Sequence, residues 1–153
     1  MTLALREIGF DEWLLAPILQ EGSASDGPFL LRLRDEWISG ACRYDREGEF
    51  LLGAFAGGVL AGIGGVSLDP YHPADGLGRV RHLYVLEEHR RRGIARALMT
   101  EILARARDRF AVLRLRTSRS EAARLYESFG FARTDAPGET HRLAFQTSCV
   151  SRP

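Results

Sequence analysis

Hydrophobic residues recur along the chain with two different periods, which predict alternating strands and helices. Leu3 to Ile8 alternates apolar and polar positions, as a half-buried strand does. Asp11 then offers an N-cap for a helix, although Pro17 lies inside the helical pattern. The glycine-rich segment EGSASDGP, residues 21–28, predicts a turn before a second helix over residues 29–40.

Both of these helices carry large apolar side chains that we expect to pack. Four of them are spaced for one face of the second helix: Leu30, Leu33, Trp37 and Ile38. Trp13 in the first helix is also expected to be a packing residue.

The middle of the chain predicts a β-hairpin and a further strand. Two apolar runs are separated by Gly57-Gly58, and glycine tolerates the positive φ that a tight hairpin turn requires. A loop rich in Pro, Asp and Gly over residues 69–78 comes next, and a strand is expected over Arg79 to Leu86.

A long helix is predicted next, over Gly93 to Phe110. Apolar side chains recur there every four residues: Ile94, Leu98, Ile102, Ala106 and Phe110. A strand over Val112 to Thr117 follows, and the order strand, helix, strand is typical of a crossover between parallel strands.

The C-terminal part predicts one more helix and a last strand. Ser118 and Glu121 have the spacing of a capping box, and Gly130 is placed to end the helix, expected over Ser120 to Phe129. One face of it should carry Ala122, Leu125, Tyr126 and Phe129. Residues 139–146 alternate as a final strand.

Length and composition fit a single α/β domain over residues 1–153 with a mixed central β-sheet. The chain has 153 residues, of which 45% are hydrophobic and 27% charged, as in an ordered globular protein. No apolar run approaches the ~20 residues of a membrane span, and no export signal is visible, so we expect a cytoplasmic protein. Cys42 and Cys149 form no metal-binding pattern, and we predict no metal.

Three consecutive arginines precede the long helix: Arg90, Arg91 and Arg92. A helix start already carries partial positive charge, so arginines are unfavourable there unless an anion binds to them. The 21 basic and 20 acidic residues nearly balance, so any anion-binding site must be local. Gly93 and Ala95 are small enough for a ligand to approach the N–H groups that open the helix. This arrangement predicts a phosphate cradle, whereas the Walker and dinucleotide-binding glycine patterns are absent.

The segment from Val80 to Phe131 resembles the GNAT superfamily of acyl-CoA-dependent N-acetyltransferases. It contains R-x-x-G-x-A after a strand ending LYV and, about thirty residues later, A-x-x-L-Y-x-x-x-G-F. The resemblance implies two strands that splay apart around the pantetheine arm of acetyl-CoA, and a tyrosine, Tyr126, that protonates the leaving thiolate. The implied contacts to the co-substrate come from Leu83, Tyr84, Val85, Arg90, Arg91, Arg92, Gly93, Ile94, Ala95, Arg96, Arg119 and Tyr126.

The sequence departs from the family at two places. Arg119 stands where many members carry an asparagine that helps to hold pantetheine. Arg79 and Arg81 occupy positions at which members often carry a glutamate base, so no carboxylate base can be carried over. Water near His82 is the candidate proton acceptor, because a strand histidine can titrate near neutrality, and the alternative is that His82 is a structural or partly exposed strand residue without a catalytic role.

We therefore predict an enzyme that transfers an acetyl group from acetyl-CoA to a primary amine of a small molecule or peptide. The missing carboxylate keeps open the alternative of an acyl-CoA-binding sensor without turnover. A nucleic-acid-binding module is disfavoured by the near-neutral charge and by the lack of aromatic residues within the basic run. No membrane partner is expected, and a homodimer is possible. Arg79 and Arg81, if they project to one side, suggest an acceptor that bears a carboxylate.

Overall fold

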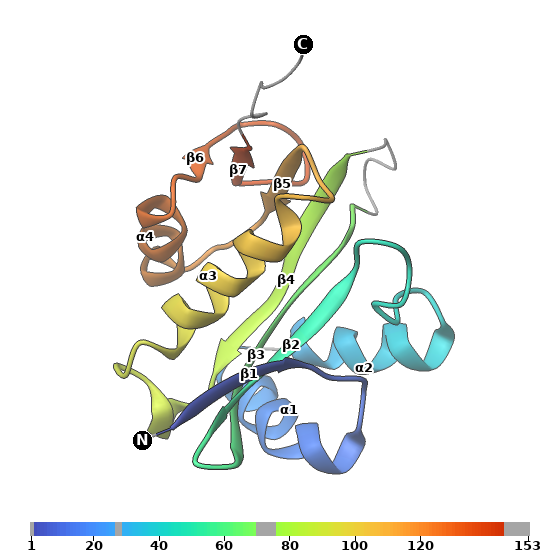
Figure 1. The fold of residues 1–153 in the computed structure, drawn as a ribbon, viewed down its shortest axis with the longest axis vertical. Coiled ribbons are helices and arrows are strands. Elements are labelled where there is room, and N and C mark those ends of the chain that lie inside the picture. The colour runs from blue at the N-terminus through green and yellow to red at the C-terminus, as the bar shows by residue number, and fades with distance from the viewer. Residues whose placement is uncertain (1, 27–28, 70–75, 146–153) are drawn as a thin grey trace.

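A mixed β-sheet forms the centre of the computed structural model, which describes residues 2–26, 29–69 and 76–145 (Figure 1). Within that part of the chain the strands lie in the order β1-β2-β3-β4-β5-β7-β6, and only β4 and β5 pair in parallel. The strands are β1 (Leu3–Glu7), β2 (Phe50–Ala56), β3 (Val59–Leu68), β4 (Leu77–Val85), β5 (Val112–Leu115), β6 (Ala132–Arg133) and β7 (His141–Ala144). The helices are α1 (Glu12–Asp26), α2 (Phe29–Ser39), the short 3₁₀ helix η1 (Glu87–His89), α3 (Ile94–Ala106) and α4 (Ser120–Ser128).

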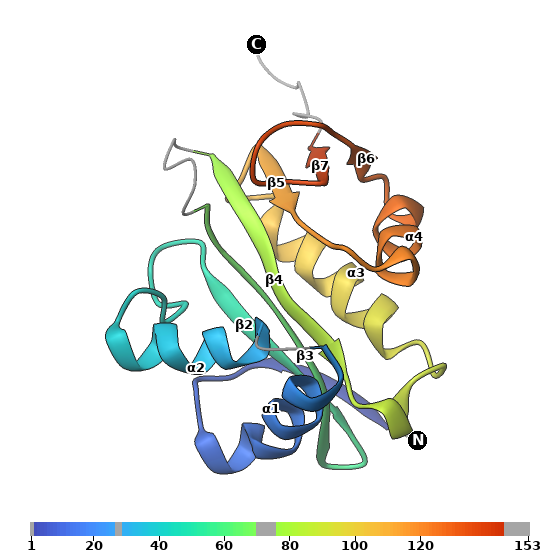
Figure 2. The same ribbon diagram turned by 180° about the vertical axis from the view of Figure 1, so that it is seen from behind.

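Helices cover both faces of the sheet and bury one hydrophobic cluster on each. Helix α3 packs on the face seen in Figure 1, where Leu98, Met99 and Ile102 join the side chains of β2 to β5. Helices α1 and α2 cover the opposite face, which Figure 2 shows, and contribute Ile18 and Leu33 to the second cluster. The predicted α/β domain with a mixed sheet is confirmed.

The helix start at Asp11 is confirmed, but the turn predicted over residues 21–28 is wrong for residues 21–26, and residues 27–28 lie outside the described part of the chain. Asp11 Oδ1 accepts the N–H groups of Trp13 and Leu14 at 3.0 and 3.1 Å. Helix α1 then continues to Asp26, through the glycine and serines that suggested a turn. A Cβ at Gly22 would lie 1.9 Å from Leu30 Cδ1, so glycine here permits close packing of α1 against α2. This tertiary contact outweighs the low helix propensity of the glycine and serines in this segment.

Two of the four side chains predicted on the buried face of α2 are fully buried, Leu30 and Leu33. Trp37 is partly buried and packs against Phe10, with ring centroids 5.8 Å apart. Ile38 is 66% exposed, so its predicted burial is wrong. Trp13 is likewise no packing residue, because it is 92% exposed at the start of α1.

The predicted hairpin is confirmed, with Gly57 and Gly58 at φ +58° and +86° between β2 and β3. Helix α3 ends at Ala106 instead of Phe110, although Phe110 is still buried in the core. The chain leaves the helix early because β5 must pair beside β4, and the N–H groups of Ala111 and Val112 both donate to the carbonyl of Gly76.

Helix α4 begins at Ser120, as predicted, but the capping box formed by Ser118 and Glu121 is wrong. The N-cap is Arg119, whose side chain makes no capping bond. Its N–H instead donates to Thr117 Oγ1 at 3.2 Å. Gly130, at φ +99°, ends the helix as predicted. Strand β5 stops at Leu115, and the two-residue strand β6 was not predicted.

Candidate active site

The parallel pair β4 and β5 separates after only three residue pairs. Leu77, Gly78 and Arg79 pair with β5, whereas β4 continues to Val85 without that neighbour. The N–H of Leu86 donates to Ala61 on β3, so the backbone groups of the preceding residue, Val85, face the opposite edge of β4. We call this unpaired edge of β4 and the diverging strand β5 the notch.

A β-bulge in β4 determines which side chains of the strand project to each face of the sheet. Ile63 pairs with Tyr84 and Gly65 with Arg81, so two residues of β4, His82 and Leu83, oppose Gly64 alone. His82 has a φ of +57°, a left-handed conformation that is rare outside glycine. The extra residue shifts the alternation of the strand by one position.

The shifted alternation places Arg81 and Tyr84 on the side of α1 and α2, and Val80 and Val85 on the side of α3. Leu83 lies two residues before Val85, so its backbone groups share the same edge of β4. The contacts of Leu83 and Val85 with pantetheine stay a prediction. Tyr84 differs, because its backbone pairs toward β3 and its hydroxyl donates to Glu21 Oε2 at 2.7 Å.

The loop that opens α3 has the geometry of an anion cradle. Arg91 and Gly93 have φ values of +65° and +80°, and left-handed residues of this kind are typical of loops whose backbone N–H groups form an anion-binding concavity. Arg91, Arg92 and Gly93 are exposed, while Ile94 anchors the loop in the core. A Cβ built on Gly93 would meet nothing within 4 Å, so the approach to the backbone is open. The cradle joins the short helix η1, which follows β4, to the start of α3 (Figure 1).

The arginines of this region have different environments. Arg90 turns back along β4: its Nε donates to the Val85 carbonyl at 2.8 Å, and its guanidinium lies 5.2 Å from the centroid of the Tyr84 ring. Arg96 links α3 to α4 through Ser128 Oγ at 3.1 Å. Of the predicted phosphate ligands, Arg91 and Arg92 are therefore the exposed pair, whereas Arg90 braces the loop against the strand.

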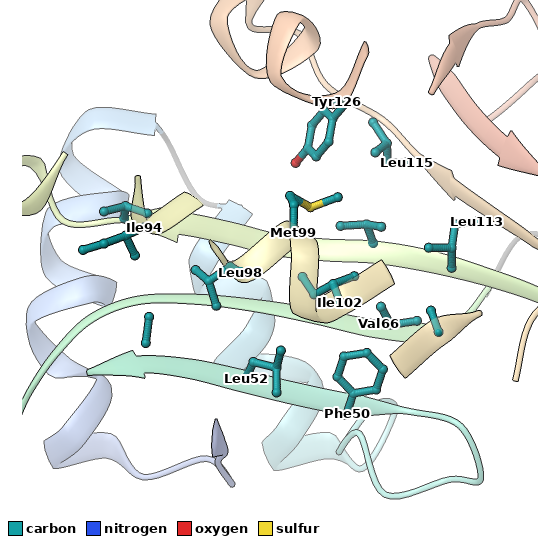
Figure 3. Packing of buried hydrophobic residues seen from close by; sticks show 14 of the residues in the cluster. Phe50, Leu52, Val66, Ile94, Leu98, Met99, Ile102, Leu113, Leu115 and Tyr126 are labelled. Carbon is teal, nitrogen blue, oxygen red and sulfur yellow. The ribbon is translucent and has the colours of Figure 1, made fainter. Parts of the chain in front are cut away.

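Tyr126 lies on α4 with its ring buried in the core beside α3. Its ring centroid lies 5.8 Å from that of Phe131, and Figure 3 shows the hydroxyl pointing toward Met99 with Leu115 beside the ring. Burial raises the pKa of Tyr126 well above its ordinary value. The hydroxyl therefore keeps its proton at neutral pH and can act as a proton donor.

His82 lies at the bulge and is buried. Burial, together with the positive charges of Arg81 and Arg32, lowers the pKa of His82 to about 3. The expectation that it titrates near neutrality is therefore wrong, because its neutral form dominates at physiological pH. Its role as proton acceptor stays a prediction, and such a low pKa makes the imidazole a weak base.

The two arginines expected to attract a carboxylate both have acidic neighbours. Arg81 Nη2 donates to both carboxylate oxygens of Glu36 on α2, at 2.7 and 2.9 Å. Arg79 Nη1 lies 3.9 Å from Asp69 Oδ2. They project to the same side, because the bulge begins after Arg81, but their charges are compensated.

A buried ionic network connects β5 to the residue that follows β3 and to the segment before β7. Arg114, 1% exposed, lies 3.2 Å from Asp69 Oδ2 and also pairs with Glu139. Its Nη2 donates to the Pro137 carbonyl at 2.8 Å. Sequence reasoning missed this network, and Glu36 as well, since the partners lie far apart in the chain and no local motif marks them.

The sequence was compared with families of known proteins. A model of the Acetyltransferase (GNAT) family matches residues 10–131. No curated protein matches the sequence. Within the described residues, no group of His, Cys, Asp and Glu could hold a metal ion, and no helix is long and apolar enough to cross a membrane.

Solved structures share the fold at low sequence identity. A candidate acetyltransferase from Exiguobacterium sp. 255-15 is 23% identical, with 94% of each chain covered and a TM-score of 0.81. An N-acetyltransferase from Staphylococcus aureus Mu50 is 15% identical, with 95% of this chain and 100% of that one covered and a TM-score of 0.72. A ribosomal-protein-alanine N-acetyltransferase from Brucella melitensis is 18% identical, with 92% and 96% covered and a TM-score of 0.67.

Proposed function

The chain belongs to the acetyltransferase (GNAT) family, and on that premise we propose that it transfers an acetyl group from acetyl-CoA directly to a primary amine. The observation that carries the proposal is the notch of β4 leading to the cradle at Arg91–Gly93. The notch offers backbone groups to the amides of the pantetheine arm. The cradle offers convergent N–H groups and two exposed guanidinium groups to the pyrophosphate.

The proposed chemistry is one acyl transfer without an enzyme nucleophile. The neutral amine nitrogen attacks the thioester carbonyl, the new C–N bond forms, and the C–S bond breaks. The thiolate leaves with a proton from Tyr126, and the nitrogen gives up its extra proton to solvent or a nearby base. Cys42 is unsuited to covalent catalysis, because burial raises the pKa of its thiol and so disfavours the thiolate.

The amine must reach the thioester in its neutral form. An alkylamine of pKa about 10.4 is mostly protonated at neutral pH, and freeing its nitrogen costs roughly 4–5 kcal/mol at about 1.36 kcal/mol per pKa unit. His82, with a pKa near 3, can offset little of this cost. Rates should therefore rise with pH as the acceptor itself loses its proton.

A panel of amines, amino acids and peptides assayed for thiol release from acetyl-CoA tests the proposal. We expect amine-dependent release, with the acetylated amine identified by mass spectrometry. CoA binding without any product across the panel would instead favour the sensor alternative, which the absence of a carboxylate on β4 supports.

A further inference from the structure

Where strand β5 leaves β4, it is held on its other side by β7. The last residue of β5 that pairs with β4 is Arg114, and the next residue, Leu115, pairs in register with His141. The N–H of Thr140 donates to the Leu115 carbonyl at 2.9 Å, and the N–H of Thr117 donates to Thr140 Oγ1 at 3.0 Å. Thr140 and His141 therefore support the wall of the notch that β5 forms.

The side chain of His141 connects this pair of strands to helix α4 through Glu127. The imidazole is 1% exposed, with Nε2 2.8 Å from Glu127 Oε2 and Nδ1 2.9 Å from Thr140 Oγ1. A carboxylate can only accept, so Nε2 carries the proton and donates to Glu127. In the neutral ring Nδ1 then accepts the hydroxyl hydrogen of Thr140. Both ring nitrogens are bonded, which gives the imidazole one fixed orientation.

The buried histidine is the partner that fixes Glu127. Its hydrogen bond is the main cause that lowers the pKa of Glu127, and the charge of Arg133 lowers this pKa further. Arg133 Nε lies 3.0 Å from Glu127 Oε2, but the arginine side chain is 72% exposed, and exposed ion pairs contribute little. A buried, fully bonded polar group such as His141 instead makes the surrounding structure rigid.

Glu127 directly follows Tyr126, the proposed proton donor, in the sequence of α4. This helix has nine residues, which is too short to be stable alone, so its place depends on tertiary contacts. Figure 3 shows Leu115, the residue that pairs with His141, beside the Tyr126 ring. The hydrogen bond between His141 and Glu127 thus joins the helix that carries Tyr126 to the strands against which its ring lies.

We propose that His141 and Glu127 are positioning residues for the acetyl transfer, because their hydrogen bond fixes α4 against β5 and β7 and so holds the Tyr126 hydroxyl in place relative to the notch. Proton donation requires a heavy-atom distance of about 2.6–3.2 Å, and a displacement of about 1 Å can cost roughly 10²-fold in rate. The two residues act through Tyr126. This inference rests on the proposed acetyl transfer.

The first test compares two substitutions of Glu127. Glu127→Ala removes the acceptor of the His141 hydrogen bond, whereas Glu127→Gln keeps an oxygen that can accept it. We expect Glu127→Ala to lower kcat with acetyl-CoA about tenfold with little change in the Kd for CoA, and Glu127→Gln to restore most of kcat. Glu121→Ala, exposed in the first turn of the same helix, should keep the kcat of the wild type. A wild-type kcat in Glu127→Ala, with chemistry rate-limiting, would overturn the proposal.

A double-mutant cycle separates positioning of Tyr126 from general damage to the fold. If Glu127 acts through the Tyr126 hydroxyl, Glu127→Ala should lower kcat no further once Tyr126→Phe has removed that hydroxyl. A tenfold loss in both backgrounds would show that Glu127 affects the enzyme by another route and would contradict its positioning role.

A second pair of variants tests the link from the side of His141. His141→Gln can place an amide N–H near the position of Nε2, whereas the shorter side chain of His141→Asn cannot reach Glu127. We expect His141→Gln to retain the higher kcat. Equal kcat values, or the reverse order, in folded variants would count against the link. Glu127 is 35% exposed, so its variants decide the question if the buried histidine cannot be replaced.

A measurement without turnover distinguishes failure of this inference from failure of the proposed function. In protein with ring-¹³C-labelled tyrosine, the NMR signal of Tyr126 is assigned by its loss in Tyr126→Phe. This signal should shift or broaden in Glu127→Ala but not in Glu121→Ala. If no amine is acetylated, the proposed function fails, and this signal still tests the link. An unchanged signal in Glu127→Ala would refute the positioning role. If amines are acetylated and Glu127→Ala keeps the wild-type kcat, the proposed function stands and this inference fails.

Discussion

The side chain of Tyr126 is buried, and burial raises its pKa, so the hydroxyl keeps its proton at neutral pH. If it protonates the leaving thiolate, Tyr126→Phe should lower kcat with acetyl-CoA by roughly 10²-fold. This is the lower end of the ~10²–10⁴ that general acids contribute, since a thiolate of pKa about 8.5 leaves fairly easily. CoA affinity, measured by calorimetry, should change little because Phe preserves the packing. Equal kcat values with chemistry rate-limiting would return Tyr126 to a purely structural role.

A single substitution at Gly93 tests whether the conformation of the cradle matters for CoA binding. The Gly93 φ of +80° costs other L-residues about 1–2 kcal/mol, and a β-branched side chain tolerates it worst. Gly93→Val should weaken CoA binding by about tenfold or more. No protein atom would clash with the new Cβ, so the loss would come from the cradle itself. Gly93→Asn, which tolerates left-handed backbone, is the control for strain, and an unchanged Kd in folded Gly93→Val would refute the cradle.

At the scale of elements, Arg114 connects β5 to Asp69, which follows β3, and to the segment before β7. Arg114→Met would leave Asp69 and Glu139 buried without their central cation. Breaking a buried ion pair in this way costs about 3–5 kcal/mol of unfolding free energy at neutral pH. Arg142→Met is the matched control, since Arg142 binds the same Glu139 at 3.2 Å from a side chain that is 45% exposed. Its loss should cost about 1 kcal/mol or less.

The same pair of variants should differ in pH dependence. Burial alone would raise the pKa of Glu139, but hydrogen bonds from Thr134 and Arg142 and the charge of Arg114 lower it. A carboxyl whose pKa is lower in the folded state stabilises the protein above its unfolded pKa, about 4.3, and this contribution is lost as pH falls. Urea unfolding should therefore show the cost of Arg114→Met shrinking toward acidic pH, as the carboxyl is protonated. A cost independent of pH would exclude the ionic explanation.

At the scale of the whole molecule, CoA binding should raise the free energy of unfolding and therefore the Tm. CoA at a hundred times its Kd should add about 2.7 kcal/mol, which corresponds to roughly 5–10 °C in Tm for a domain of this size. Pantetheine lacks the phosphates and should give a smaller shift. Arg92→Ala should reduce the shift with CoA but not that with pantetheine, because the guanidinium group acts on phosphate charge. Equal reductions for both ligands would indicate damage to the fold.

Elements marked by local patterns were predicted well. Asp11 caps α1 and Gly57-Gly58 turns the hairpin, and the periodic side chains from Ile94 to Ala106 are buried along α3. Predictions failed where packing between distant segments decided the outcome. Helix α1 passes through residues 21–26 because Gly22 fits against Leu30, and α3 stops before Phe110 because the chain must turn to place β5 beside β4.

Except for the two-residue strand β6, the sequence by itself determined the order of the strands and the α-helices, together with the loop at Arg91–Gly93 and the place of Tyr126 on a helix, because periodicity, caps and glycine conformations act over a few residues. The tertiary structure alone decided which charges meet. The bulge at His82 sets the faces of β4, and Arg81 meets Glu36 from a segment 45 residues away. Register and burial depend on contacts across the whole sheet, so the low pKa of His82 and the pairing that neutralises Arg81 have no signature in the local sequence.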